Sequence, residues 1–299
     1  MTTIDSETVT FSTEDGCDLA GDLYIGQSPK IAVVISGGTG FPRRFYRQFA
    51  SYLAEQGAVV LTYDYRGIGD SKGGSLKGSK IDLPDWGRHD LPAGVNALEK
   101  RFPGLPITHV GHSVGGHFVG LMPNHAKVAR HAFLAVSTGY HGHHALSYRP
   151  TEYYFWWLLG PFSLLRHGYV KPMGGWRGEA LPPQVFKTWR RWSHRRDYFK
   201  SEMDTTLDPQ RYAQVDAPIR SWLFSDDPIA TAKASDVMLG FYPNALKTRK
   251  VVSPEDIGVK RIGHEGAFRP DCTKLWNEVW DWLSQAQGST QQPETLAAI

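Results

Sequence analysis

The run Ile31-Ala-Val-Val-Ile35 limits the fold of this 299-residue chain more narrowly than any other feature. Five consecutive apolar residues, most of them β-branched, are typical of a strand buried on both faces, as in a parallel sheet covered by helices. A glycine-rich turn follows, then the apolar spacing of a helix over Arg44 to Gln56, then a second apolar run, Ala58 to Tyr65. This order of strand, helix and strand predicts an α/β fold with a mostly parallel central sheet and helices on both faces.

The same alternation continues along most of the chain, and we expect an antiparallel hairpin before it. The further predicted strands are Val9–Thr13, Asp18–Ile25, Ile107–Val110, His131–Thr138, Ile219–Ser225 and Arg249–Ser253. The further predicted helices are Asp90–Phe102, one beginning over Gly115–Pro123, Ala232–Phe241 and Lys274–Leu283.

The alternation stops between residues 139 and 211, a segment rich in Trp, Tyr, His, Arg, Gly and Pro with short aromatic helical stretches such as Val185 to His194. This composition predicts an insertion over the sheet, and we call residues 139–211 the lid. The predicted core then consists of residues 1–138 and 212–285. The polar residues 286–299 are predicted to be a disordered tail.

The net charge of the chain does not point to a particular class of partner. Lys and Arg number 33 against 30 Asp and Glu, and a net charge of +3 gives no reason to expect nucleic acid or an anionic membrane as a partner.

The first residues, Met1 to Phe11, lack the basic and apolar parts of a secretion signal, and no apolar run approaches the roughly 18 residues that span a bilayer. We predict a cytoplasmic protein that acts on a small molecule, and leave its oligomeric state open.

The segment Gly111-His-Ser-Val-Gly115 matches the pattern G-x-S-x-G, in which a strand turns sharply into a helix and lifts a serine hydroxyl above the sheet. The serine occupies a strained backbone conformation, so its neighbours must pass without a Cβ atom. An apolar strand precedes this segment and small and apolar residues follow it. We predict that Ser113 is a nucleophile.

A second match, Gly69-Asp-Ser-Lys-Gly73, tests whether the pattern is meaningful, because a chain with 31 glycines can match it by chance. This segment follows a loop and runs into another glycine-rich loop, so it lacks the strand before the serine and the helix after it. We interpret Ser71 as a turn residue.

A serine nucleophile needs an imidazole to take its proton and a carboxylate to orient the imidazole. Of the 12 histidines, only His264 follows the late strands, in a glycine-flanked loop. Asp226 and Asp227 come directly after the strand Ile219–Ser225, and we prefer Asp227 because a residue before proline is held extended. The predicted catalytic residues are therefore Ser113, Asp227 and His264, with Asp226 as the alternative acid.

An oxyanion hole needs backbone N–H groups directed at the developing negative charge. Val114, directly after the nucleophile, supplies one. The second comes from the turn after Ile31–Ile35, where either Gly38 or Thr39 can donate, and we leave that choice open.

These motifs, together with Asp64-Tyr-Arg-Gly-Ile-Gly-Asp-Ser71, Ser225-Asp-Asp-Pro228 and Gly263-His264, resemble the α/β-hydrolase superfamily. The resemblance covers nearly the whole chain and is nearest to predicted bacterial hydrolases near the serine aminopeptidase and monoglyceride lipase branch. It implies the α/β-hydrolase fold, an inserted lid and a Ser-Asp-His triad. Many relatives have His-Gly after the third strand where this chain has Ser36-Gly37. We therefore make no prediction about the detailed shape of the turn after Ile31–Ile35, which we call the oxyanion turn.

The lid carries most of the information about substrate. Its aromatic residues form the core of the lid and also an apolar wall for an acyl chain or an aromatic acid, with Tyr153, Trp156 and Trp157 as predicted substrate-binding residues. The segment His141-Gly-His-His144 lacks a carboxylate or cysteine at ligand spacing, so we predict no metal site and no cofactor.

The predicted reaction is hydrolysis of a carboxylic ester or thioester of a small apolar acyl substrate through an acyl-enzyme. One alternative is an aminopeptidase-like hydrolase in which Glu152 or Glu179 holds the substrate amino group. The other is a non-catalytic ligand-binding protein that keeps the fold.

Overall fold

The fold is built on one eight-stranded sheet. A computed structural model describes residue 4 and residues 6–285; the predicted tail, 286–299, lies outside them. The strand order is β1-β2-β4-β3-β5-β6-β7-β8. β1 pairs antiparallel with β2 and β2 antiparallel with β4, while the remaining pairs are parallel. The strands are β1 Ser6–Ser12, β2 Asp18–Ile25, β3 Ile31–Ser36, β4 Ala58–Tyr63, β5 Ile107–His112, β6 Val128–Leu134, β7 Ile219–Phe224 and β8 Lys247–Val252.

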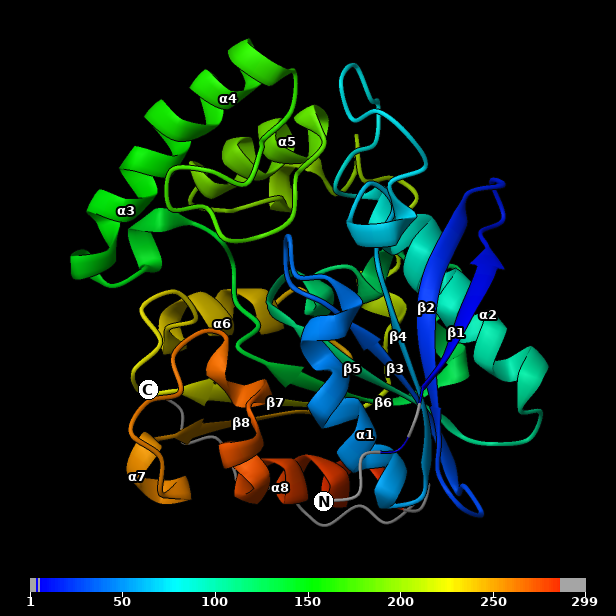
Figure 1. Cartoon of the computed structure of the whole chain (residues 1–299). Helices are drawn as coiled ribbons and strands as arrows, with labels where there is room; N and C mark the ends of the chain where they lie inside the picture. The colour runs from blue at the N-terminus through cyan, green and yellow to red at the C-terminus, as the bar shows by residue number, and fades with distance from the viewer. Residues whose placement is uncertain (1–3, 5, 286–299) are drawn as a thin grey trace.

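Helices cover both faces of this sheet (Figure 1). One apolar core joins the sheet to α1 and α8, and a second joins the opposite face to α2 and α6. Every residue of β3, β4 and β5 is buried, as the continuous apolar runs predict. The helices are α1 Arg47–Glu55, α2 Leu91–Arg101, α3 Arg149–Tyr153, α4 Gly160–His167, α5 Pro183–Ser193, α6 Ala232–Leu239, α7 Pro254–Ile257 and α8 Thr273–Leu283. The predicted α/β-hydrolase fold is confirmed.

One predicted helix is wrong. After the nucleophile the chain forms two short 3₁₀ turns, Ser113–Gly116 and Val119–Leu121, where we predicted the start of a longer helix over Gly115–Pro123. Three of those nine residues are glycines, and each glycine costs a helix about 1 kcal/mol relative to alanine. Gly120 lies flat against the Tyr212 ring, and a Cβ atom there would be 2.3 Å from it. Close packing has replaced helix formation at this point.

Residues of the lid form α3, α4 and α5, which lie together beyond one end of the sheet (Figure 1). A π-helical segment, Tyr154–Leu159, joins α3 to α4, so that residues 149–167 run as one continuous helical arm. Within the described residues, no helix is long and apolar enough to cross a membrane.

Candidate active site

The turn after β5 holds Ser113 in a backbone conformation that serine rarely adopts, with φ +50°. The two motif glycines make this turn possible. A Cβ atom on Gly115 would lie 2.1 Å from the carbonyl oxygen of Ser36, and one on Gly111 would lie 2.8 Å from the backbone nitrogen of Gly116. Neither glycine can be replaced without moving the backbone that carries the serine.

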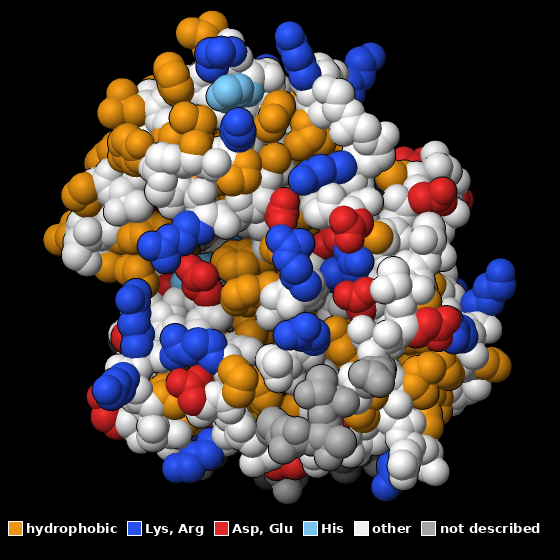
Figure 2. All heavy atoms as spheres, viewed as in Figure 1, with side chains coloured by type: hydrophobic (Ala, Val, Ile, Leu, Met, Phe, Trp, Pro, Cys, Tyr) orange, Lys and Arg blue, Asp and Glu red, His pale blue; other side chains and the backbone are white. Residues whose placement is uncertain are grey.

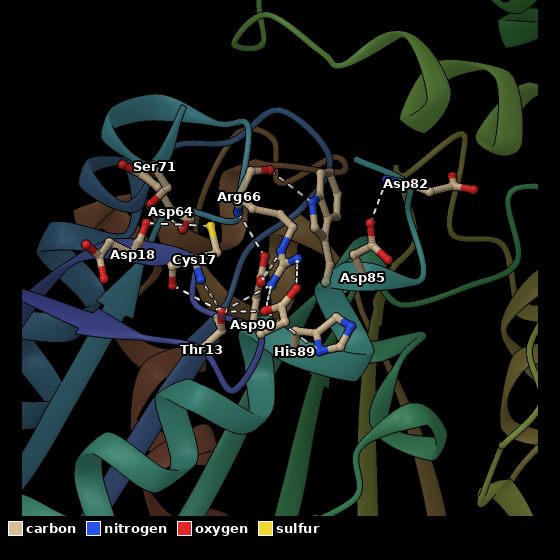
Figure 3. Close-up of polar contacts among 12 residues, drawn as sticks. Thr13, Cys17, Asp18, Asp64, Arg66, Ser71, Asp82, Asp85, His89 and Asp90 are labelled. Atoms are coloured by element: carbon tan, nitrogen blue, oxygen red, sulfur yellow. Dashed lines mark hydrogen bonds and ion pairs between the residues drawn. The ribbon is translucent and has the colours of Figure 1, made fainter. Parts of the chain in front are cut away.

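The second G-x-S-x-G segment has a structural role. The Ser71 hydroxyl donates to the carbonyl of Asp64 at 2.7 Å and accepts from the N–H of Ala20 at 2.9 Å, which ties the loop after β4 to β2. Arg66, two positions after Asp64 in the sequence, belongs to the same loop. Its guanidinium lies 2.6 Å from the fully buried carboxylate of Asp90. Figure 3 shows the Arg66 side chain turned toward Asp90 and Thr13. This loop is thus held by buried polar contacts.

The structure brings together the three residues predicted as a triad. His264 Nε2 lies 3.0 Å from Ser113 Oγ, and His264 Nδ1 lies 2.8 Å from Asp227 Oδ2. Burial by itself lowers the pKa of His264, but the charge of Asp227 and its hydrogen bond outweigh burial and raise that pKa above its ordinary value. Burial likewise opposes ionisation of Asp227, yet the His264 charge and hydrogen bonds from His264, Ile229 and Ala230 lower its pKa.

The neighbouring carboxylate, Asp226, has a different position from the one that a catalytic acid needs. It accepts the backbone N–H groups of Ile262 and Gly263, each at 2.9 Å. Asp226 therefore fixes the loop that carries His264, while Asp227 contacts the imidazole itself. The two adjacent aspartates therefore hold different parts of the same loop: Asp226 binds backbone N–H groups, and Asp227 binds the His264 side chain.

In the turn after β3, the two candidate oxyanion donors, Gly38 and Thr39, have different surroundings. The N–H of Gly38 donates to the hydroxyl of Tyr46 at 2.8 Å, so it is already occupied. Thr39 lines the same cavity as Ser113 and Val114. This arrangement favours the backbone N–H of Thr39 over that of Gly38.

His112, inside the nucleophile motif, was not singled out from the sequence. It is fully buried, with Nδ1 2.8 Å from the Tyr46 hydroxyl and Nε2 3.0 Å from the carbonyl oxygen of His264. Because that carbonyl can only accept, Nε2 carries the proton and Nδ1 accepts from Tyr46. Burial, reinforced by the nearby His264, lowers the pKa of His112 to about 3, which keeps the ring neutral.

A cavity of about 260 Å³ opens beside Ser113 and His264, roofed by aromatic residues of the lid. Of the predicted substrate-binding residues, Trp156 lines it, and Tyr153 and Trp157 do not. The helical arm turns the latter two outward, where they are 48% and 52% exposed, and Arg190 stacks on Trp157 at 4.0 Å. The lid residues that join Trp156 in the aromatic wall are Tyr148, Tyr154, Phe155, Trp176 and Trp189. Helical phase, which the aromatic run did not reveal, decides which rings face the cavity.

The lid also touches the oxyanion turn. Trp176 packs over Gly40, where a Cβ atom would lie 2.6 Å from the indole ring. The N–H of Glu179 donates to the carbonyl of Gly40 at 2.7 Å, and its carboxylate lies 2.6 Å from the Arg44 guanidinium and 3.3 Å from the Lys72 ammonium. The wall of the cavity and the turn beneath it are therefore in direct contact.

Two histidines of the lid have hydrogen-bond partners within the protein. His144 Nδ1 lies 2.6 Å from the buried carboxylate of Glu152, and His141 Nδ1 lies 2.9 Å from the carbonyl of Ser193. Over residue 4 and residues 6–285, no group of three or more His, Cys, Asp or Glu side chains is arranged to hold a metal ion.

Known proteins resemble this chain in sequence and in fold. Residues 27–166 match the family described as serine aminopeptidase, S33. An 89-residue segment is 33% identical to human monoglyceride lipase and 32% identical to the monoglyceride lipase homologue of monkeypox virus. These segments cover 30% and 29% of this chain, but only 28% and 30% of those relatives, so the match spans less than a third of their length.

Two solved structures match nearly the whole fold at low identity. An esterase of Pyrococcus furiosus has a TM-score of 0.61 at 15% identity, covering 95% of this chain and 92% of that one. A soluble variant of monoglyceride lipase from Saccharomyces cerevisiae, in complex with a substrate analogue, has a TM-score of 0.61 at 15% identity, covering 95% of each chain. This chain therefore has the fold of the α/β-hydrolases, and its sequence is similar to the serine aminopeptidase family over residues 27–166 and to monoglyceride lipases over 89 residues.

Proposed function

We propose that this protein is a serine hydrolase that cleaves a carboxylic ester or thioester of a small apolar acyl group through an acyl-enzyme. One observation carries the proposal: His264 lies within hydrogen-bond reach of both the Ser113 hydroxyl, at 3.0 Å, and the Asp227 carboxylate, at 2.8 Å. A nucleophile, a base and an orienting acid need this relationship.

In the proposed first half-reaction, Nδ1–H of His264 donates to Asp227, which leaves Nε2 free to accept the Ser113 proton. Ser113 Oγ attacks the carbonyl carbon, and the N–H groups of Val114 and Thr39 hold the oxyanion. His264 then gives its proton to the departing oxygen or sulfur. Water repeats the sequence on the acyl-enzyme and releases the acid.

The aromatic wall supports an apolar acyl group. Trp156 and its neighbours present ring surface to the cavity beside Ser113, and burying such surface stabilises a bound acyl chain by about 25 cal/mol per Å². The cavity volume, about 260 Å³, favours a short chain or a single ring. The lid boundaries 139–211, the cytoplasmic location and the small-molecule substrate remain predictions.

Peptide hydrolysis has less support. An aminopeptidase needs a carboxylate placed to bind the substrate ammonium. Glu179 is paired with Arg44 and Lys72 and does not line the cavity. Glu152 does line it, with one oxygen 2.6 Å from His144 Nδ1 and the other without a hydrogen-bond partner, so this alternative depends on Glu152 alone. A comparison of p-nitrophenyl acyl esters with aminoacyl p-nitroanilides separates the two reactions, and we expect turnover of the esters alone.

Labelling with a fluorophosphonate probe tests the nucleophile, and the second G-x-S-x-G segment provides a matched control. We expect the wild type and Ser71→Ala to be labelled and Ser113→Ala to be unlabelled, with turnover of p-nitrophenyl butanoate reduced by about 10⁴-fold or more in Ser113→Ala. Circular dichroism confirms that each variant is folded. Labelling that persists in Ser113→Ala excludes Ser113. A wild type that is neither labelled nor active on esters, yet binds a small molecule tightly, supports the non-catalytic alternative.

A further inference from the structure

His264 lines a second hollow in addition to the cavity. This is an open groove of about 410 Å³, and it shares Tyr148, Ile229, His264 and Glu265 with the cavity. Thr39, Ser113 and Val114 line the cavity and not the groove. The two hollows therefore meet at His264, with the proposed oxyanion donors on the cavity side. We call the second hollow the arginine groove, because Arg177, Arg261 and Arg269 line it.

Two of these arginines lie against the loop that carries His264. The Arg261 guanidinium packs over Gly263, where a Cβ atom would be 3.4 Å from Nε, and the Arg269 guanidinium packs over Gly266, where a Cβ atom would be 3.1 Å from Cζ. The third, Arg177, comes from the lid. Positive side chains thus approach the base both from its own loop and from above. Figure 2 shows basic and acidic side chains gathered at the level where the lid meets the core.

The charges in the groove do not cancel. Arg269 is paired with Asp271 at 3.3 Å and also donates to the carbonyl of Arg261. Within the described part of the chain, the side chains of Arg177, Arg261 and Glu265 take part in no ion pair. Two unpaired guanidiniums and one unpaired carboxylate leave an excess of one positive charge, which matches one monoanion better than a phosphate dianion and opposes an ammonium group.

The proposed reaction determines which part of the substrate enters this groove. His264 Nε2 must deliver its proton to the leaving oxygen, so the leaving group lies beside His264 and extends away from the oxyanion donors. The apolar cavity lies beside Ser113 and suits the acyl group. The leaving group is then the part of the substrate that faces the arginine groove.

We propose that the arginine groove binds a carboxylate carried by the leaving-group portion of the ester, so that the substrate joins an apolar acyl group to a hydroxy or thiol acid. This inference rests on the proposed function. Arg177 and Arg261 bind the carboxylate, and planar guanidinium groups suit it because each can donate two parallel hydrogen bonds.

Two chromogenic esters that differ in one carboxylate test the proposal: 4-nitrophenyl butanoate and 3-carboxy-4-nitrophenyl butanoate. The quantity measured is the ratio of their kcat/KM values, because intrinsic reactivity cancels when that ratio is compared between variants. We expect Arg177→Gln and Arg261→Gln each to lower the relative kcat/KM of the carboxylated ester about three- to fivefold, mainly through KM. Glu265→Gln should raise it, and 0.5 M NaCl should weaken the wild-type preference.

Arg166→Gln is the matched control, since Arg166 is an exposed arginine of the lid that does not line the groove. It should leave the ratio unchanged, and melting temperatures verify that all variants are folded. A ratio that stays at the wild-type value in both Arg177→Gln and Arg261→Gln overturns the carboxylate site while the neutral ester is still hydrolysed. Loss of the proposed function itself is a different result, in which neither ester is hydrolysed and the fluorophosphonate probe does not react.

Discussion

The hydroxyl of Tyr46 lies 2.8 Å from Nδ1 of His112. This contact connects the turn after β3, which contains Gly38, to the loop that carries His264. On one side, the same hydroxyl accepts the N–H of Gly38; on the other, His112 Nε2 lies 3.0 Å from the carbonyl of His264. The donors and acceptors form one directed chain, because an N–H group begins it and a carbonyl ends it. Tyr46 and His112 are therefore positioning residues for groups that we propose act on opposite sides of the substrate carbonyl.

Tyr46→Phe should lower kcat about tenfold and leave KM nearly unchanged, because it removes two buried hydrogen bonds, each worth roughly 1 kcal/mol, and frees Gly38 and His112 to shift. Steady-state kinetics with a neutral ester measures both constants. Tyr52→Phe is the control, since the Tyr52 hydroxyl bonds Asn277, away from the site. An unchanged kcat in Tyr46→Phe would contradict a positioning role.

The pH dependence of kcat/KM should report the charge of Asp227. Proton transfer from Ser113 requires neutral His264, so activity rises as pH rises through the His264 pKa, which Asp227 raises above the ordinary 6.5. Asp227→Asn removes that charge, so the acid limb should move to lower pH, and the rate should fall about 10⁴-fold because the tautomer is lost. A limb that stays in place in Asp227→Asn would mean that another group controls it.

Asp226→Ala should behave differently from Asp227→Asn. It removes the acceptor of the Ile262 and Gly263 N–H groups, so the base should be displaced while its carboxylate partner remains. We expect kcat to fall up to about 10²-fold, with the acid limb of the pH profile unmoved. The same pH series, run on both variants, measures this. A shift of the limb in Asp226→Ala equal to that in Asp227→Asn would show that the two carboxylates are not separate in function.

Arg66→Ala should destabilise the fold by about 3–5 kcal/mol, because it leaves the carboxylate of Asp90 buried without its cation. Urea unfolding followed by circular dichroism gives the free energy. The control is Arg101→Ala, which breaks an exposed ion pair with Glu7 and should change stability by less than about 1 kcal/mol. Equal effects of the two substitutions would contradict a structural role for the buried pair.

The sequence predicted the sheet well because continuous apolar runs such as Ile31–Ile35 have few alternatives to a strand buried on both faces. It also predicted the triad residues that the structure brings together, since chain order and loop context distinguish Ser113 from Ser71 and His264 from the other histidines. The distinct position of Asp226 depended on the backbone of a distant loop, which no local pattern reveals.

Other features depended on tertiary contacts. Our preference for Thr39 over Gly38 as the proposed oxyanion donor depends on Tyr46, which accepts the Gly38 N–H. The helix predicted over Gly115–Pro123 gave way to tight packing against Tyr212. Tyr153 and Trp157 face outward because of helical phase. The arginine groove joins residues from the lid and from the loop of the base, which are more than eighty positions apart in the chain for Arg177 and Arg261.

The contact between Trp176 and Gly40 limits how freely this lid can be exchanged. A lid transplanted from a relative would meet a glycine surface shaped for one particular indole, and an acceptor at the Gly40 carbonyl that only a correctly placed N–H group can satisfy. Chimaeras made to change substrate preference should therefore take both the lid and the segment equivalent to residues 37–41 from the same relative. In this protein, the segment that must be exchanged to transfer substrate preference includes part of the core as well as the lid.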